Sequence, residues 1–227
     1  MMATLIDRKQ LKWDMKDLLA DAQVSPRAMA ALYLGLSLVL SMADTLAGDS
    51  GLLATFLSIL TSLLGMVLSA GFVLYCMAVR RGERAEFLTL FDGFSFVGKL
   101  IGLNLLMYLF IALWSMLLVV PGIIAAYRYR MALYLLLDHP EMSVMQCIRE
   151  SKRMMKGHKG ELFVMDLSFL GWAILESIPV FGYAVQVWTT PYISMSYVLY
   201  YEALRGAETV NDAGNGGTWR EAPPWEG

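Results

Sequence analysis

Six long apolar segments constrain the fold of this chain more than any other feature of its sequence. A helix needs about 20 residues to cross the ~30 Å hydrocarbon core of a bilayer, and spans near 17 residues still suffice. Segments of this kind predict six transmembrane helices, at residues 28–46, 52–79, 100–120, 121–137, 162–178 and 182–201. The expected fold class is therefore all-α: a polytopic membrane bundle of three hairpins, each running from inside to outside and back.

The boundary between the third and fourth spans depends on two residues. Residues 100–127 form one uncharged run that is longer than a single span needs. We place the division at Pro121 and Gly122, because proline lacks the N–H that a helix interior uses and glycine tolerates a turn. The fourth span is then short, and it contains Arg128 and Arg130.

The basic residues predict the orientation of the spans, because short cytoplasmic loops are enriched in Lys and Arg. The chain has 18 such residues. Apart from Arg128 and Arg130, all of them lie in segments on one side of the six-span arrangement: Arg8, Lys9, Lys12, Lys16, Arg27, Arg80, Arg81, Arg84, Lys99, Arg149, Lys152, Arg153, Lys156, Lys159, Arg205 and Arg220. The turns on the other side have none. This predicts a multi-pass protein with its N-terminus and C-terminus both in the cytoplasm.

The domain organisation follows from the spans and the segments that flank them. Residues 1–26 are predicted to be a cytoplasmic amphipathic segment lying on the membrane, and residues 27–205 the transmembrane domain. Residues 206–227 are polar and net acidic, so we expect a disordered cytoplasmic tail. We expect no cleavable signal peptide before the first span, so that this span remains in the mature protein.

A second amphipathic helix is predicted between the fourth and fifth spans, at residues 143–157. Ser143 and Gln146 have the spacing of a capping box, and Gly157 is a helix stop signal. Basic residues follow one face at i, i+3, i+4 and i+7. We expect these residues and the next lysine to contact anionic lipid headgroups: Arg149, Lys152, Arg153, Lys156 and Lys159. The alternative is a solvated charged face that only keeps this loop inside.

Few ionisable residues lie within the spans, and such residues must find a partner or water. Asp166 and Arg130 have similar predicted depths near the cytoplasmic side. We expect Asp166 to accept hydrogen bonds from Arg130 or Arg128, forming an intramembrane polar cluster that could line a cavity. In the alternative reading, the arginines extend to the membrane surface and Asp166 only braces the bundle.

The motifs of soluble enzymes are incomplete in this sequence. Residues 93–99 imitate a phosphate-binding loop, but Leu100 occupies the position that needs Ser or Thr. His139 and His158 lack metal-ligand spacing. We therefore predict no catalytic residue, no metal site, no cofactor and no nucleic-acid partner.

Six short motifs resemble one bacterial family. They begin at Leu90 (LFDGF), Val120 (VPGII), Asp138 (DHPEMS), Met154 (MMKGHK), Leu167 (LSFLGW) and Thr190 (TPY). In this order they are similar to the domain of unknown function 975 family (DUF975), over roughly residues 5–203. The resemblance implies a bacterial plasma-membrane protein without an established activity. Asp166 matches the family pattern, whereas Arg128 and Arg130 depart from it.

Two functions remain open from the sequence. The first is a non-enzymatic scaffold, assembly or regulatory protein whose partners are the lipid bilayer, other membrane proteins or further copies of itself. The second is a small-solute transporter or channel-like protein with a cavity near Asp166. The scarcity of polar residues within the spans favours the first.

Overall fold

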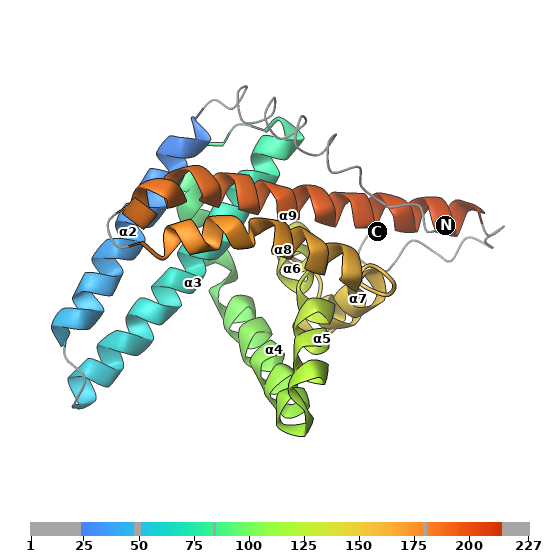
Figure 1. Cartoon of the computed structure of the whole chain (residues 1–227), viewed down its shortest axis with the longest axis horizontal. Coiled ribbons are helices and arrows are strands. Elements are labelled where there is room, and N and C mark those ends of the chain that lie inside the picture. The colour runs from blue at the N-terminus through green and yellow to red at the C-terminus, as the bar shows by residue number, and fades with distance from the viewer. Residues whose placement is uncertain (1–23, 48–50, 84, 179–180, 215–227) are drawn as a thin grey trace. The chain divides into compact units, whose positions relative to one another are not determined.

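The computed structural model describes residues 24–47, 51–83, 85–178 and 181–214, which are helical apart from short turns and contain no strand. The all-α prediction is confirmed for these residues (Figure 1). By contact pattern they divide into two compact units. One comprises residues 24–97 and 169–196, and the other residues 98–168 and 197–214. The predicted N-terminal amphipathic segment lies outside the described residues, except for its last three.

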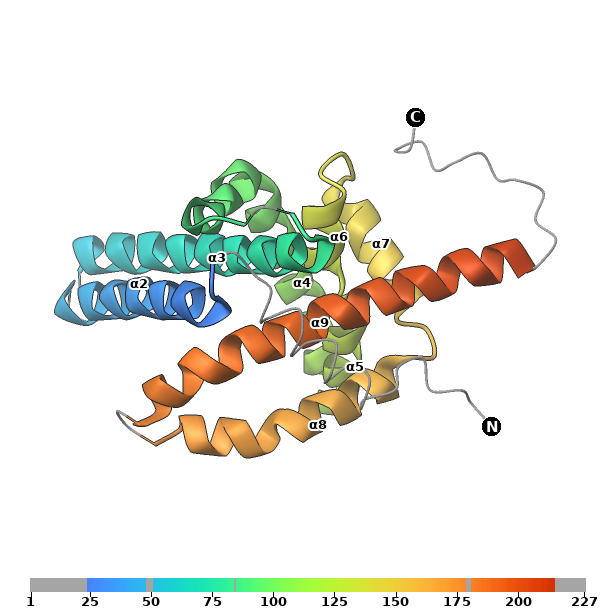
Figure 2. The ribbon, with the colours of Figure 1, turned by 90° about the horizontal axis from the view of Figure 1, so that it is seen from above.

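The first unit begins with two long apolar helices, α2 (Pro26–Ala47) and α3 (Leu52–Arg81). They lie side by side (Figure 2). The rings of Tyr33 and Phe72 approach to 5.2 Å, and the Tyr75 hydroxyl donates to the main-chain carbonyl of Val24 at 2.8 Å. Helix α3 ends at Gly82, which adopts the left-handed conformation (φ 69°) that glycine adopts without steric cost.

A ten-residue 3₁₀ helix, η1 (Phe87–Phe96), packs directly on α3. Two glycines make this close approach possible. A Cβ atom on Gly71 would lie 1.8 Å from the carbonyl oxygen of Leu90, and one on Gly93 would lie 2.3 Å from that of Val67. Any side chain at either glycine would therefore collide with main-chain atoms of the other element.

The second unit contains helices α4 (Val97–Leu117), α5 (Val119–Tyr129), α6 (Ala132–Asp138) and α7 (Val144–Met154), the unit boundary falling after the first residue of α4. The division between the third and fourth predicted spans falls at Leu118, which is extended (φ −165°, ψ 145°), and not at Pro121. Pro121 lies in the first turn of α5, where a missing N–H costs nothing. Gly122 lets this turn approach Ser115, whose Oγ would lie 2.0 Å from an added Cβ.

The fourth predicted span, residues 121–137, is not one helix. It consists of α5 and α6, which are separated by a turn at Arg130 and Met131. Helices α8 (Lys159–Glu176) and α9 (Phe181–Gly214) complete the described chain, and each contributes to both units. Because α9 runs to Gly214, residues 206–214 of the predicted disordered tail are helical, and residues 215–227 lie outside the described residues.

Three helical segments are long and apolar enough to cross a membrane among the residues searched: Pro26–Leu46, Leu52–Arg81 and Phe87–Met116. They correspond to the first three predicted spans, although the third begins earlier than residue 100. The other three spans and the hairpin topology remain predictions. Exposed apolar side chains cover all three segments, including Met42, Phe56 and Leu109 at 56–63% exposure, as lipid-facing helices require.

Candidate functional site

Asp166 lies at the centre of a polar network within the second unit. The Tyr127 hydroxyl donates to Asp166 Oδ2 at 2.9 Å, and the Tyr197 hydroxyl donates to Oδ1. Tyr197 in turn accepts a hydrogen bond of 2.9 Å from Arg130 Nη2. Helices α5, α8 and α9 thus each contribute a member, and Arg130 comes from the turn between α5 and α6. Both carboxylate oxygens of Asp166 have a donor, as an acceptor inside an apolar bundle needs.

The direct bond that we expected between Asp166 and an arginine is not formed. Tyr197 lies between Arg130 and Asp166, and the guanidinium carbon of Arg130 lies 4.7 Å from the centre of the Tyr197 ring. The aromatic hydroxyl is both donor and acceptor, so it connects two groups of opposite charge while keeping them apart. The side chain of Arg128 makes no hydrogen bond or ion pair with Asp166, both residues being within the described ranges.

Arg128 participates through its main chain instead. Its carbonyl oxygen accepts a 2.9 Å hydrogen bond from the hydroxyl of Ser151, a fully buried residue of α7. The turn at Arg130 and Met131 interrupts the regular helical pattern next to this carbonyl. A buried carbonyl needs a partner, and Ser151 supplies it. Helix α7 is therefore fixed to the break in the fourth predicted span.

The capping box predicted for α7 is present. Gln146 donates its main-chain N–H to Ser143 Oγ at 3.3 Å, and Ser143 donates its own to Gln146 Oε1 at 2.7 Å. The helix ends at Met154, and Gly157 follows with φ 92°. The predicted and observed starts agree, while the observed end is three residues earlier.

Helix α7 has two contrasting faces. One is buried and consists of Cys147, Ile148, Ser151 and Met154. This face contacts α5 and α6, and Ile148 and the neighbouring Met155 are buried within the protein. The other face is exposed and carries Arg149, Lys152 and Arg153, and the fourth predicted basic residue, Lys156, is exposed in the turn just after the helix. We call these four residues the α7 basic face. Lys159 does not belong to it, because it is the first residue of α8.

The charges of the α7 basic face are largely uncompensated. Arg153 pairs with Glu150 one turn before it. Arg149, Lys152 and Lys156 form no ion pair with any residue in the described parts of the chain. An exposed row of cations on a firmly packed helix is suited to binding anions at a surface.

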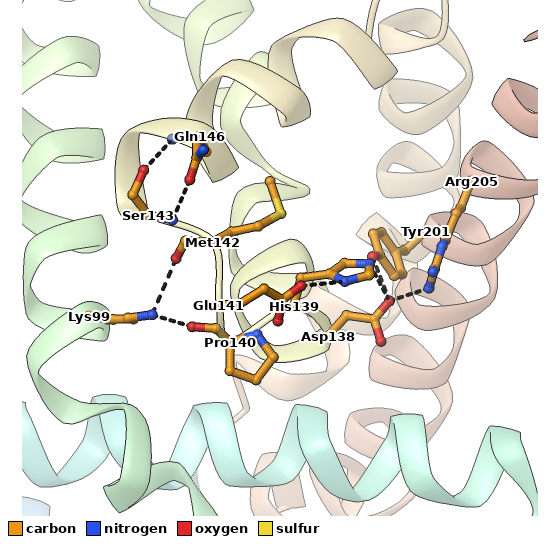
Figure 3. Close-up of polar contacts among 10 residues, drawn as sticks. All are labelled: Lys99, Asp138, His139, Pro140, Glu141, Met142, Ser143, Gln146, Tyr201 and Arg205. Carbon is orange, nitrogen blue, oxygen red and sulfur yellow. Dashed lines mark hydrogen bonds and ion pairs between the residues drawn. The ribbon is translucent and has the colours of Figure 1, made fainter. Parts of the chain in front are cut away.

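The loop between α6 and α7 is held from two sides (Figure 3). On one side, Lys99 of α4 donates to the carbonyl oxygens of Pro140 and Met142, the latter at 3.3 Å. On the other side, α9 provides Tyr201 and Arg205, which bind Asp138 Oδ2 at 2.8 and 2.6 Å. The last residue of α6 and the residues that precede α7 are therefore both held by contacts with other helices.

His139 joins the same cluster from within the loop. Its Nδ1 lies 3.1 Å from Glu141 Oε1, and its Nε2 lies 3.7 Å from Asp138 Oδ2. No sequence pattern identified Asp138, Tyr201, Arg205 or Lys99 as partners in this loop. The motif that begins at Asp138 was the only signal that pointed to this loop. Helical spacing of Tyr197, Tyr201 and Arg205 on α9 is visible in the sequence, but their partners on other helices are not.

Residues 115–208 match the family model described as protein of unknown function DUF975. This match supports the family resemblance that the motifs indicated, over these residues. The match contains the Asp166 network, helix α7 and the anchored loop with its α9 partners, but not α2, α3 or η1. It is shorter than the resemblance drawn from motifs, which began near residue 5. No match was found among curated proteins, and none among solved structures.

A metal centre has no basis in the described residues, since no group of three or more His, Cys, Asp or Glu side chains converges there. The two cysteines, Cys76 and Cys147, are both buried and free. Burial raises the pKa of Cys147 from 9.0 to about 11, although the nearby Lys99 acts in the opposite direction. This thiol is held as a neutral group of the α7 packing face.

Proposed function

We propose that this DUF975 protein is an integral membrane protein that scaffolds, assembles or regulates other envelope components and carries out no chemistry. In this proposal, the α7 basic face holds anionic lipid headgroups at the cytoplasmic surface of a bacterial plasma membrane. The observation that supports it most directly is the division of α7 into a face packed on α5 and α6 and a face of exposed cations.

The energetics of such a contact favour binding. A cation close to an anionic leaflet contributes about 1 kcal/mol, so three uncompensated cations contribute about 3 kcal/mol. Helix α7 is already folded and fixed by Ser151 and by the capping box. Little conformational entropy is therefore lost on binding, which lets most of the electrostatic gain appear as affinity.

Lipid titration of the purified protein tests this proposal. We would measure thermal stability in detergent while adding either phosphatidylglycerol or phosphatidylcholine. The anionic lipid should raise the melting temperature more than the zwitterionic one. The variant Arg149→Gln/Lys152→Gln/Lys156→Gln should lose this difference.

A charge-preserving control separates charge from side-chain shape. Arg149→Lys/Lys152→Arg/Lys156→Arg keeps three cations and should keep the response to phosphatidylglycerol. Equal responses to both lipids in the unmodified protein would contradict the proposal. So would a full response in the triple-Gln variant.

Solute transport is the second candidate, and the Asp166 network is the observation that favours it. Asp166 is partly exposed, and it is held by two hydroxyl groups and connected through Tyr197 to a cation. A solute that bound Asp166 would replace the tyrosine hydroxyls. A thermal-shift screen of metabolites, ions and lipids in nanodiscs tests this function. Stabilisation by a small solute that is lost in Asp166→Asn would favour transport over scaffolding.

A further inference from the structure

The side chains of η1 are segregated into three rows, as the geometry of a 3₁₀ helix requires. Such a helix has about three residues per turn, so every third residue faces the same way. Leu90 and Gly93 form the buried middle of the row that packs against α3, while Phe87 and Phe96 at its two ends are exposed and partly exposed. Leu88, Phe91 and Phe94 form an apolar row. Thr89, Asp92 and Ser95 form a polar row.

The apolar row of η1 is exposed. Leu88, Phe91 and Phe94 have exposures of 69%, 43% and 46%. The rings of Phe91 and Phe94 are stacked with their centres 6.4 Å apart, which confirms that they share one side of the helix. The polar row is outward as well, since Asp92 and Ser95 are exposed and Thr89 is partly exposed. One outward direction is therefore apolar and the other polar.

The position of η1 along α3 indicates where these two directions point. Gly71, which contacts Leu90, lies about 28 Å from Leu52 at ~1.5 Å per residue. This distance is close to the ~30 Å thickness of the hydrocarbon core. Leu52 and Leu53, at the other end of α3, are 92% and 71% exposed, as expected where the helix enters that core. Gly71 then lies at the opposite boundary of the core, on the side of Arg80 and Arg81.

We propose that η1 lies in the membrane interface at the Arg80–Arg81 end of α3. Leu88, Phe91 and Phe94 insert among the acyl chains, and Thr89, Asp92 and Ser95 face the headgroups and water. Amphipathic helices in this position bury their apolar face just below the headgroups. Asp92 excludes a deeper position, because an exposed carboxylate in the hydrocarbon core would have no partner. The third apolar segment thus begins to cross only after η1.

In this position, η1 is a membrane-contact surface of the first unit and is independent of the α7 basic face. Its rigidity comes from the two glycine contacts with α3, which fix the rotation of the 3₁₀ helix. The occupant of the apolar row is lipid and not a partner protein, because the same helix turns a polar row toward water. A groove on a partner protein would not require η1 to present separate apolar and polar rows.

Spin-label accessibility in proteoliposomes tests the three-row pattern. A nitroxide would be attached in turn at Leu88→Cys, Phe91→Cys, Phe94→Cys, Thr89→Cys, Asp92→Cys and Ser95→Cys, in a Cys76→Ala/Cys147→Ala background. Labels on the apolar row should collide mainly with oxygen, which concentrates in lipid. Labels on the polar row should collide mainly with a water-soluble nickel chelate. The preference should alternate with a period of three residues.

Photo-crosslinking of the unmodified chain keeps the test independent of any variant that fails to fold. Diazirine-bearing phospholipids, followed by mass spectrometry, should modify Leu88, Phe91 or Phe94 and spare Thr89, Asp92 and Ser95. Nickel accessibility at all six labelled positions would overturn the proposal by placing η1 in water. Oxygen accessibility at all six would overturn it by placing η1 inside the span, and absence of crosslinks to the apolar row would also contradict it.

Discussion

Ser151 of α7 donates its hydroxyl proton to the carbonyl oxygen of Arg128, and this single bond connects the basic helix to the break between α5 and α6. Ser151 is fully buried, so water cannot replace the bond. Replacing Ser151 with alanine should lower the free energy of unfolding by about 1–3 kcal/mol, because the carbonyl is left without a donor. Thermal unfolding in detergent measures this loss. Gln146→Ala, which removes only a partly exposed capping group, should cost about 0.5–1 kcal/mol, at the low end of capping effects.

Tyr197 should matter more than Tyr127, although both donate to Asp166. Tyr197→Phe removes the donor to Asp166 and the acceptor of Arg130 together. Tyr127→Phe removes one donor only. Since each hydrogen bond to a charged group contributes about 1.5–3 kcal/mol, Tyr197→Phe should destabilise the protein roughly twice as much. Equal melting temperatures for the two variants would contradict the placement of Tyr197 between Arg130 and Asp166.

The glycine contacts of η1 give a prediction with a matched control on the same helix. Gly71→Ala should be strongly destabilising, by about 1–3 kcal/mol or more, because the added methyl group meets the main chain of Leu90. Gly65→Ala has no atom within 4 Å of the added carbon. It should be neutral or stabilising by up to about 1 kcal/mol, as expected for a helix interior. Chemical or thermal unfolding distinguishes the two.

Cys147 predicts a pH dependence with a defined direction. Because burial raises its pKa to about 11, the folded protein disfavours the thiolate. The stability contributed by the neutral thiol is complete below the unfolded pKa of 9.0, and it is lost as the pH rises toward 11. In a Cys76→Ala background, a maleimide should therefore label Cys147 slowly at pH 8 and faster as the pH rises toward 11. Rapid labelling of the folded protein at pH 8 would exclude the buried position.

Sequence patterns identified the elements that depend on local chemistry. The uncharged runs predicted α2 and α3, because the length and composition of an apolar segment identify it without knowledge of the helices that pack against it. The spacing of Ser143 and Gln146 predicted the start of α7 for the same reason. Pro121 was assigned to the wrong place, since a proline is compatible both with a helix break and with a first helical turn.

Contacts between distant residues could not be predicted in the same way. The sequence placed Asp166 and Arg130 at similar depth, but the rotation of α9, which brings Tyr197 between them, is set by packing across the whole unit. The break at Arg130 and Met131 has no proline or glycine to mark it. The anchoring of the α6–α7 loop by Lys99, Tyr201 and Arg205 likewise depends on where three separate helices meet.

The position of α9 after α6 and α8 in the chain has a consequence for biosynthesis. Asp138 and Asp166 both depend on hydroxyl groups of this helix, at Tyr201 and Tyr197, which the ribosome adds 63 and 31 residues later. Until α9 is synthesised, Asp138 and Asp166 lack these hydroxyl donors. The polar contacts of both carboxylates can therefore form only once this part of α9 has been synthesised.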